Sequence, residues 1–185
     1  VKDTLNSVIK NGSIDLSSVE ITDDEIKDFE QICIVACGSA WHVGMAAQYV
    51  LEEMADIPVR VELASEFRYR KMPIDQKALM IVVSQSGETA DTLAALRLAK
   101  EKNITTMAIV NVVGSSIARE ADKVFYTLAG PEISVATTKA YSSQLAAMYC
   151  LAVKFAHVRG KITDEQYSYY VSELQTIPEK IHKIL

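Results

Sequence analysis

The chain has 185 residues, of which 49% are hydrophobic, and its 24 acidic and 19 basic side chains give a formal net charge of -5. This length allows one large hydrophobic core and demands no second domain. The negative charge provides no field to attract DNA, RNA or an anionic membrane surface. No uncharged apolar stretch reaches roughly 18 residues and the N-terminus lacks a signal-peptide pattern, so we expect a cytoplasmic protein that spans no membrane.

The cysteines Cys33, Cys37 and Cys150 show no C-x-x-C spacing. Cys33 and Cys37 are predicted to share one strand, where four residues span about 13 Å, well beyond the reach of a disulfide. We therefore expect three reduced thiols, no zinc site and no cofactor.

Taken in chain order, the sequence begins with a predicted helical lead-in over residues 1–30. Its last helix opens at Thr22-Asp23-Asp24-Glu25, which has the Thr-x-x-Glu form of a capping box. Short apolar runs then predict strands at residues 32–36, 59–63, 79–83, 105–110 and 123–128. Amphipathic segments between them predict helices at residues 41–55, 65–69, 88–102 and 115–121. This alternation indicates a parallel sheet between helical layers, a three-layer α/β/α sandwich.

A long helix is predicted at residues 138–158, with one buried stripe at helical spacing that consists of Tyr141, Leu145, Met148, Ala152 and Phe155. Gly160 ends this helix. Residues 163–166, Thr-Asp-Glu-Gln, form a second capping box that opens a helical extension over residues 161–185. Pro178 is expected to end or restart that extension. With an α/β core at residues 31–160, we expect residues 1–185 to form a single domain.

The run Ser84-Gln85-Ser86-Gly87-Glu88-Thr89 follows the most apolar predicted strand and precedes a helix. A phosphate monoester needs several converging donors, and the start of a helix offers unpaired N–H groups at the positive end of its dipole. Hydroxyls of Ser84, Ser86 and Thr89 would add donors, while Gly87 lets the backbone approach closely. The alternative is that Ser86 is only an N-cap, although one cap does not account for so many donors.

Two further turns place hydroxyls at a helix start on the same predicted edge of the sheet. They are Cys37-Gly38-Ser39-Ala40 and the segment 130–139, which ends in Thr137-Thr138-Lys139. Thr137 or Thr138 can also be read as a simple helix cap. The glycines match neither G-x-G-x-x-G nor the phosphate-loop pattern, which disfavours a nucleotide. Three such turns predict one pocket for a small phosphorylated ligand, and a sugar phosphate fits it.

Three other features receive a structural interpretation. His42 is expected to be a hydrogen-bonded structural group without a catalytic role. The basic cluster at residues 68–71 is short and set in an acidic chain, so it is interpreted as a solvated turn or a subunit contact. Tyr167, Tyr169 and Tyr170 open an amphipathic helix, which favours packing over a stacking platform.

The three turns resemble motifs of the sugar isomerase (SIS) domain family, in particular the first of the two SIS domains of glucosamine-6-phosphate synthases. The resemblance rests on residues 36–39, 84–92, 130–132 and 135–139, in the same order and spacing, and it extends from about Ile32 to beyond Leu151. It implies a flavodoxin-like fold with five parallel strands. It also implies binding of fructose 6-phosphate for an enzyme that forms glucosamine 6-phosphate with ammonia from glutamine.

Carried over residue by residue, the resemblance implies phosphate binding by Ser84, Gln85, Ser86 and Thr89. It implies that the sugar is bordered by Cys37, Gly38, Ser39, Val135, Ala136 and Thr137. The family usually reads Cys-Gly-Thr-Ser-Tyr in the first turn, so Ala40 lacks a hydroxyl and any contact there comes from the backbone. Thr137 replaces the usual serine and keeps the hydroxyl.

In the family, the Schiff-base lysine and the isomerisation carboxylate and histidine lie in the second SIS domain, and a nucleophilic cysteine lies in a glutaminase domain. Neither domain is in these 185 residues. We therefore expect a homodimeric chain that binds substrate without catalysis and works with both domains in a full-length protein. Two alternatives remain: a non-catalytic phosphosugar sensor, and a stand-alone phosphosugar isomerase that uses Glu66 or Glu132 as its base.

Overall fold

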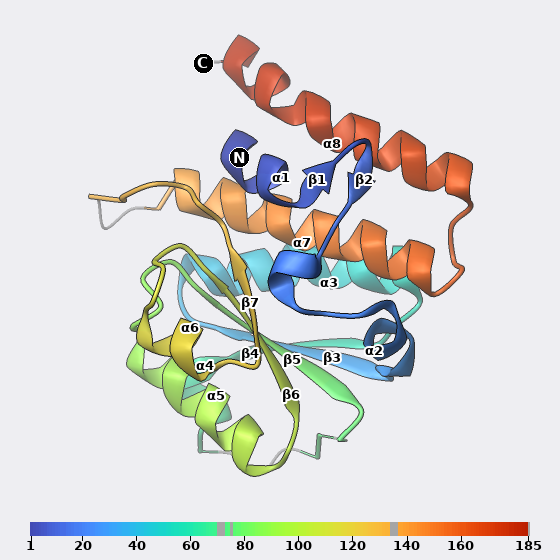
Figure 1. Ribbon diagram of the computed structural model, residues 1–185. Helices are drawn as coiled ribbons and strands as arrows, with labels where there is room; N and C mark the ends of the chain where they lie inside the picture. The colour runs from blue at the N-terminus through green and yellow to red at the C-terminus, as the bar shows by residue number, and fades with distance from the viewer. Residues whose placement is uncertain (70–72, 75, 134–136, 185) are drawn as a thin grey trace.

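The computed structural model describes residues 1–69, 73–74, 76–133 and 137–184. Its centre is a parallel sheet of five strands in the order β4-β3-β5-β6-β7 (Figure 1). The strands are β3 (Gln31–Ala36), β4 (Val59–Leu63), β5 (Ala78–Ser84), β6 (Thr105–Val110) and β7 (Lys123–Tyr126). This is the flavodoxin-like order, in which ligands bind beyond the carboxyl ends of the strands. The predicted fold class and parallel sheet are confirmed.

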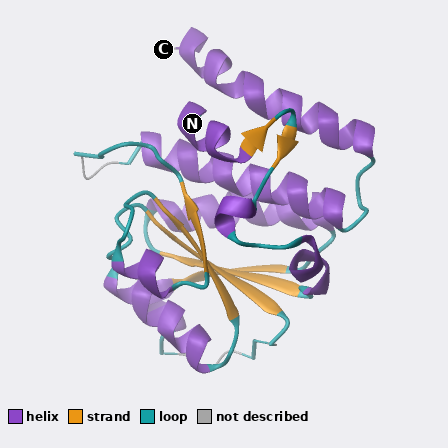
Figure 2. Cartoon of the chain, viewed as in Figure 1, coloured by secondary structure: helices purple, strands orange, loops and turns teal. Residues whose placement is uncertain are grey.

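Helices cover both faces of the sheet (Figure 2). The helices α3 (Ser39–Ala55) and α7 (Lys139–Val158) lie on one face. The other face is covered by α4 (Ala64–Phe67), α5 (Ala90–Glu101) and α6 (Ser116–Glu120). These are the three predicted layers, and each helix bound lies within two residues of its predicted position.

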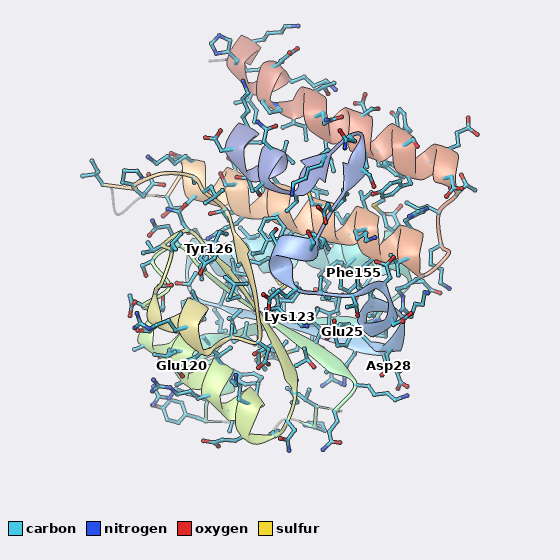
Figure 3. The ribbon with its side chains drawn as sticks, viewed as in Figure 1. Glu25, Asp28, Glu120, Lys123, Tyr126 and Phe155 are labelled. Carbon is cyan, nitrogen blue, oxygen red and sulfur yellow. The ribbon has the colours of Figure 1, made fainter. Side chains whose placement is uncertain are left out.

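Successive side chains of a strand point to opposite faces of the sheet, so the hydrophobic core consists of two clusters, one on each face. In β3, Ile32 and Ile34 pack in the cluster that contains α3 and α7, whereas Cys33 and Val35 pack in the cluster that contains α5. Every residue of β5 is buried, as expected for a central strand covered on both faces. The predicted stripe of α7 also packs against the first cluster, and Figure 3 labels its Phe155, which is fully buried.

The N-terminal segment is more structured than the predicted helical lead-in. It consists of α1 (Lys2–Val8), an antiparallel hairpin of β1 (Ile9–Lys10) and β2 (Ser13–Ile14), a 3-10 turn at Ser17–Val19, and α2 (Asp23–Asp28). Asn11 and Gly12 join the two short strands, with φ of 53° and 73°. Positive φ at both central residues is the geometry for which Asn-Gly is favoured in tight hairpins. The hairpin was not predicted, although this sequence signal was present.

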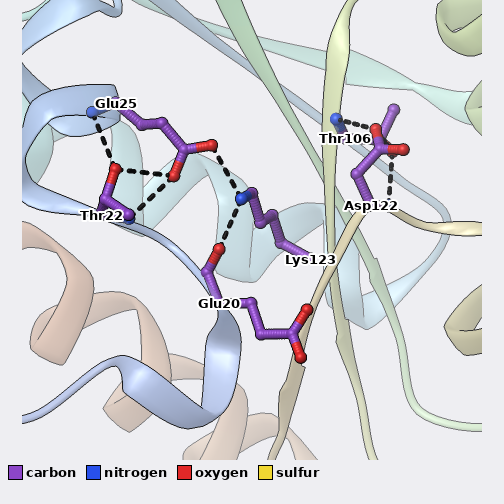
Figure 4. Close-up of polar contacts among 6 residues, drawn as sticks. All are labelled: Glu20, Thr22, Glu25, Thr106, Asp122 and Lys123. Carbon is purple, nitrogen blue, oxygen red and sulfur yellow. Dashed lines mark hydrogen bonds and ion pairs between the residues drawn. The ribbon is translucent and has the colours of Figure 1, made fainter.

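The first capping box forms as predicted and also ties the N-terminal segment to the sheet (Figure 4). The amide of Glu25 donates to Thr22 Oγ1 at 3.2 Å, and the amide of Thr22 donates to Glu25 Oε2 at 2.8 Å. The other oxygen of Glu25 lies 2.8 Å from Nζ of Lys123, at the start of β7. Lys123 also donates to the carbonyl of Glu20.

The helix α8 (Asp164–Ile184) packs outside α7, and α1 lies between the two (Figure 1). Its predicted capping box is confirmed, because the Gln166 amide donates to Thr163 Oγ1 and the Thr163 amide donates to Gln166 Oε1. The prediction that Pro178 ends or restarts the helix is wrong. Pro178 lies inside α8, and Ile177 beside it still packs against the core, so tertiary contacts carry the helix past the missing amide.

Tyr167 has a packing role, as predicted. Its ring is buried and stacks on His157 with ring centroids 4.1 Å apart, while its hydroxyl accepts a hydrogen bond of 2.7 Å from the amide of Ile14. Tyr169, two residues on, is 60% exposed. In the described part of the chain, no helix is both long and apolar enough to cross a membrane.

Candidate functional site

The three turns singled out in the sequence meet at the carboxyl edge of the sheet, where α7 begins on the left of Figure 1. They surround a cavity of about 290 Å³. Its lining includes every predicted site residue that the structure describes: Cys37, Gly38, Ser39, Ser84, Gln85, Ser86, Thr89 and Thr137. The remaining two predicted residues, Val135 and Ala136, lie outside the described residues. The described part of the wall also includes Ala40, Val83 and Gln144.

In the central turn, side-chain hydroxyls converge on one another and on the backbone. Ser84 Oγ lies 2.9 Å from Thr89 Oγ1 and accepts a hydrogen bond of 3.1 Å from the amide of Gly87. Ser86 Oγ accepts one of 3.2 Å from the amide of Glu88. The N-cap of α5 is Thr89, without a side-chain capping bond, so the alternative interpretation of Ser86 as that N-cap is wrong.

The central turn is held from behind by the loop that follows β6. Gly87 has a φ of +68°, and a Cβ there would lie only 2.0 Å from Ser115 Oγ. The amide of Ile117 donates to the carbonyl of Gly87 at 3.0 Å, and the amide of Ser116 donates to Glu88 Oε1 at 2.8 Å. The hydrogen bonds to Ser116 lower the pKa of Glu88 below its ordinary value. The backbone of the turn therefore has little freedom to move.

Asn111, immediately after β6, joins the central turn to the third turn. Its amide donates to the carbonyl of Gln85 at 3.2 Å. Its side chain donates to the carbonyl of Gly130 at 2.8 Å and accepts from the amide of Ala129 at 2.7 Å. Sequence reasoning missed Asn111. The available signal was a polar residue at the carboxyl end of a buried strand, where ligand sites of parallel sheets lie.

The third turn provides Thr137 to the cavity and a carboxylate to the start of α7. The N-cap of α7 is Thr138, which makes no side-chain capping bond. The amide of Ala140 instead donates to Glu132 Oε2 at 3.3 Å, and Lys139 donates to the carbonyl of Pro131. An acidic group beside a helix N-terminus is favourable for the dipole, so Glu132 stabilises this turn.

The first turn brings Ser39 to the cavity through a left-handed glycine. Gly38 is the N-cap of α3 with a φ of +58°, and Ser39 begins the helix. His42 is exposed and makes an edge contact with Trp41, with ring centroids 4.9 Å apart. His42 makes no hydrogen bond with the described residues, so the expectation of a hydrogen-bonded structural group is not met, and it is absent from the described lining of the cavity.

None of the three cysteines forms a disulfide with a described residue. Cys37 lines the cavity, whereas Cys33 and Cys150 are buried in the core. Burial raises the pKa of the Cys150 thiol to about 12, so this group stays protonated and unreactive. Among the described residues, no group of His, Cys, Asp and Glu has the arrangement of a metal site.

Of the basic cluster, Arg68 and Tyr69 are described, and neither is among the described residues that line the cavity. Arg68 forms an ion pair of 2.9 Å with Asp91 and lies over the ring of Tyr69, 4.9 Å from its centroid. Arg70 and Lys71 lie outside the described residues. Glu66, a candidate base in the stand-alone isomerase alternative, is also absent from the described lining of the cavity.

Gln144 is the cavity residue that the sequence analysis missed. It lies in the second turn of α7 and is only 1% exposed. A signal was available, because Gln144 is three residues after Tyr141 and four before Met148 and therefore lies within the predicted apolar stripe. A glutamine in such a stripe needs a partner for its amide.

Comparisons with known proteins identify the family of the chain. The profile of the SIS domain family matches residues 25–154. Glutamine–fructose-6-phosphate aminotransferase (isomerizing) of Clostridium tetani is 52% identical over the whole chain, and the Methanosarcina mazei enzyme of that name is 47% identical over 94% of it. The chain spans 31% and 28% of these relatives' lengths.

Among solved structures, the C-terminal domain of glucosamine-fructose-6-phosphate aminotransferase from Francisella tularensis superimposes with a TM-score of 0.91 and 41% identity. The match covers 95% of this chain and 50% of that one. Glucosamine-6-phosphate deaminase from Thermotoga maritima, at 23% identity and a TM-score of 0.67 over 93% of this chain and 53% of its own, shares the fold.

Proposed function

This chain belongs to the SIS domain family, and from that premise we propose that it is the fructose 6-phosphate-binding domain of a glutamine–fructose-6-phosphate aminotransferase. One observation carries the proposal: the central turn, Ser39 and Thr137 line a single cavity at the carboxyl edge of the sheet. Three segments distant in sequence thus present hydroxyls to one space of about 290 Å³, close in size to a small polar ligand.

In this proposal the phosphate lies against the central turn. Ser84, Gln85, Ser86 and Thr89 surround it, and the start of α5 supplies the positive end of a helix dipole. The Ser84 and Thr89 hydroxyls bond to each other, and both can turn their protons toward phosphate oxygens. The sugar lies against the other turns, bordered by Cys37, Gly38, Ser39, Val135, Ala136 and Thr137.

The same proposal assigns catalysis to other domains. The relatives are about three times as long as this chain, which leaves room for a glutaminase domain and a second SIS domain. Glu132 is occupied at the start of α7, and neither it nor Glu66 is among the described residues that line the cavity. We therefore propose that residues 1–185, as one domain of a cytoplasmic homodimer, hold the sugar phosphate without converting it.

The assignment is tested by titrating fructose 6-phosphate into the wild-type chain and Ser86→Ala. A hydroxyl that donates to a phosphate dianion contributes about 1.5 to 3 kcal/mol, so we expect binding to weaken roughly 10- to 150-fold. Ser172→Ala is the matched control, because Ser172 is an exposed residue of α8 whose Oγ bonds only to the carbonyl of Tyr169. Equal affinity of the wild type and Ser86→Ala, measured by calorimetry, would refute the phosphate site.

A further inference from the structure

Gln144 presents an unusual combination of burial and lack of partners. Its side chain belongs to the cavity wall and is 1% exposed, and its Oε1 accepts no hydrogen bond from the described residues. A buried amide oxygen without a donor is costly, because it loses its bonds to water and gains none from protein. A polar group of this kind that persists beside a cavity indicates a partner that arrives with the ligand.

Small residues flank Gln144 on its own helix. Ala140 and Ala147 precede and follow it on the same side of α7, and both are small and buried. The terminal torsion of glutamine is soft, so the amide can rotate without a movement of the helix. A rotation about this torsion would be enough to point Oε1 at a ligand in the cavity that Gln144 lines.

Gln144 Oε1 is a hydrogen-bond acceptor, so the ligand group that binds it must be a donor. A phosphate dianion offers only acceptors, so the anion held by the central turn cannot satisfy Gln144 Oε1. A hydroxyl can, because it donates one hydrogen bond and accepts others. The wall thus combines hydroxyl donors for an anion at the central turn with an acceptor for an O–H group on α7.

We propose that Gln144 is a substrate-binding residue that accepts a hydrogen bond from a hydroxyl of the sugar and so selects a phosphorylated polyol over free phosphate. This inference rests on the proposed function of the cavity. The other buried polar atoms without a partner in the described residues, Trp41 Nε1, Thr92 Oγ1 and Ser115 Oγ, belong to residues that do not line the cavity. Among the described residues, only Gln144 both lines the cavity and has a buried polar atom without a partner.

The test compares two ligands, fructose 6-phosphate and inorganic phosphate, by calorimetric titration of four proteins: the wild-type chain, Gln144→Met, Ser86→Ala and Gln175→Met. Methionine keeps the length of the side chain and removes both amide atoms. We expect Gln144→Met to bind fructose 6-phosphate roughly five- to tenfold more weakly, with the affinity for inorganic phosphate within about twofold of wild type. Gln175→Met, the same change on α8 outside the cavity, should alter neither affinity.

A melting curve gives an independent readout. Because methionine removes an unsatisfied buried polar group, the Tm of Gln144→Met without ligand should equal or exceed that of wild type. Wild-type affinity of Gln144→Met for fructose 6-phosphate would overturn the inference, as would an equal loss for both ligands. If Ser86→Ala left both affinities unchanged, or if the wild type bound neither ligand, the proposed function would fail and this inference with it.

Discussion

The amino and carboxyl edges of the parallel sheet differ in whether their polar groups have hydrogen-bond partners. At the amino edge, Arg159 donates to the carbonyls of Ala55 and Phe29, and Asp122 accepts from the amide and hydroxyl of Thr106 (Figure 4). At the carboxyl edge, buried polar atoms remain without partners. The contrast separates the part of the fold that provides stability from the part that is available for binding.

The unsatisfied atoms are not scattered. Four buried side-chain atoms lack a partner in the described part of the chain, and they belong to Trp41, Thr92, Ser115 and Gln144. Each residue lies at the N-cap or in the first two turns of a helix that follows a strand at the carboxyl edge. These groups are therefore concentrated at the carboxyl edge of the sheet, and Gln144 is the one among them that lines the cavity. Unsatisfied polar groups at a binding edge are expected when function is favoured over stability.

The largest expected effect comes from breaking the amino edge. Arg159→Met removes a charged donor shared by two good carbonyl acceptors, Ala55 at 3.0 Å and Phe29 at 2.9 Å. We expect a loss of about 3 to 4 kcal/mol in the free energy of unfolding, measured with urea, and unchanged affinity for fructose 6-phosphate once folded.

Arg97→Met is the matched control for that change. Arg97 bonds only to the carboxylate of Glu120 at the surface, and its side chain is 58% exposed. Exposed ion pairs contribute under about 1 kcal/mol. Similar losses for the two variants would show that the amino edge is not a special source of stability.

A smaller loss of stability, with a larger effect on binding, is expected at the carboxyl edge. Gly87→Ala places a Cβ 2.0 Å from Ser115 Oγ and requires a left-handed alanine at a φ of +68°. We expect a loss of about 2 to 3 kcal/mol in stability, together with loss of phosphate binding, because the central turn must shift.

Gly114→Ala separates the clash from the backbone strain. Gly114 has a φ of +72°, and a Cβ there would meet nothing within 4 Å. This control should lose about 1 kcal/mol and keep its affinity. If Gly87→Ala behaved like Gly114→Ala in both measurements, tight packing behind the central turn would have no role in ligand binding.

The smallest effect concerns Asp122 and depends on pH. Burial raises the pKa of this carboxyl, but the hydrogen bonds from Lys100 and Thr106 outweigh burial and hold the pKa below its ordinary value. The stability it contributes is thus present above the unfolded pKa of about 3.9 and is lost as the pH falls through the lower folded value. At about pH 7, Asp122→Asn should lower the free energy of unfolding by under about 1 kcal/mol, which appears as a slightly lower Tm.

The pH dependence of the Tm difference between the wild type and Asp122→Asn tests the role of the Asp122 charge. Melting curves of wild type and Asp122→Asn should converge as the pH approaches about 3, because the wild-type carboxyl is then being protonated. A Tm difference that stayed constant from about pH 7 to about pH 3 would show that the charge of Asp122 does not contribute.

Much of the fold was predictable because it depends on local pattern. The strands β4 and β6 begin and end at the predicted residues, since continuous or alternating apolar runs bounded by polar residues specify them. The hairpin at residues 9–14 was missed because each strand has only two residues, too few to show a period. Pro178 was misjudged because packing of α8, which the local rule ignores, overrides its helix-breaking tendency.

The candidate site likewise has residues that the sequence predicted and residues that it did not. Ser84, Ser86 and Thr89 were recognisable because a cluster of hydroxyls between a buried strand and a helix has a chemical meaning by itself. Asn111 and Gln144 carry only a weaker signal, a polar residue at the end of a buried strand and a polar residue within an apolar stripe. Their roles depend on Gly130 and on the cavity, which other segments provide.

By itself, the sequence determined the order of strands and helices, the parallel sheet and the central hydroxyl turn, because each follows from periodicity and residue type within a short window. Only the tertiary structure decided which loops meet and which helix starts bond to carboxylates distant in the sequence, such as Glu88 at the start of α6. It also decided that Gln144 Oε1 has no partner among the described residues. Those outcomes depend on distances between segments far apart in the chain, and hydrogen bonds form only when such segments come within about 3 Å.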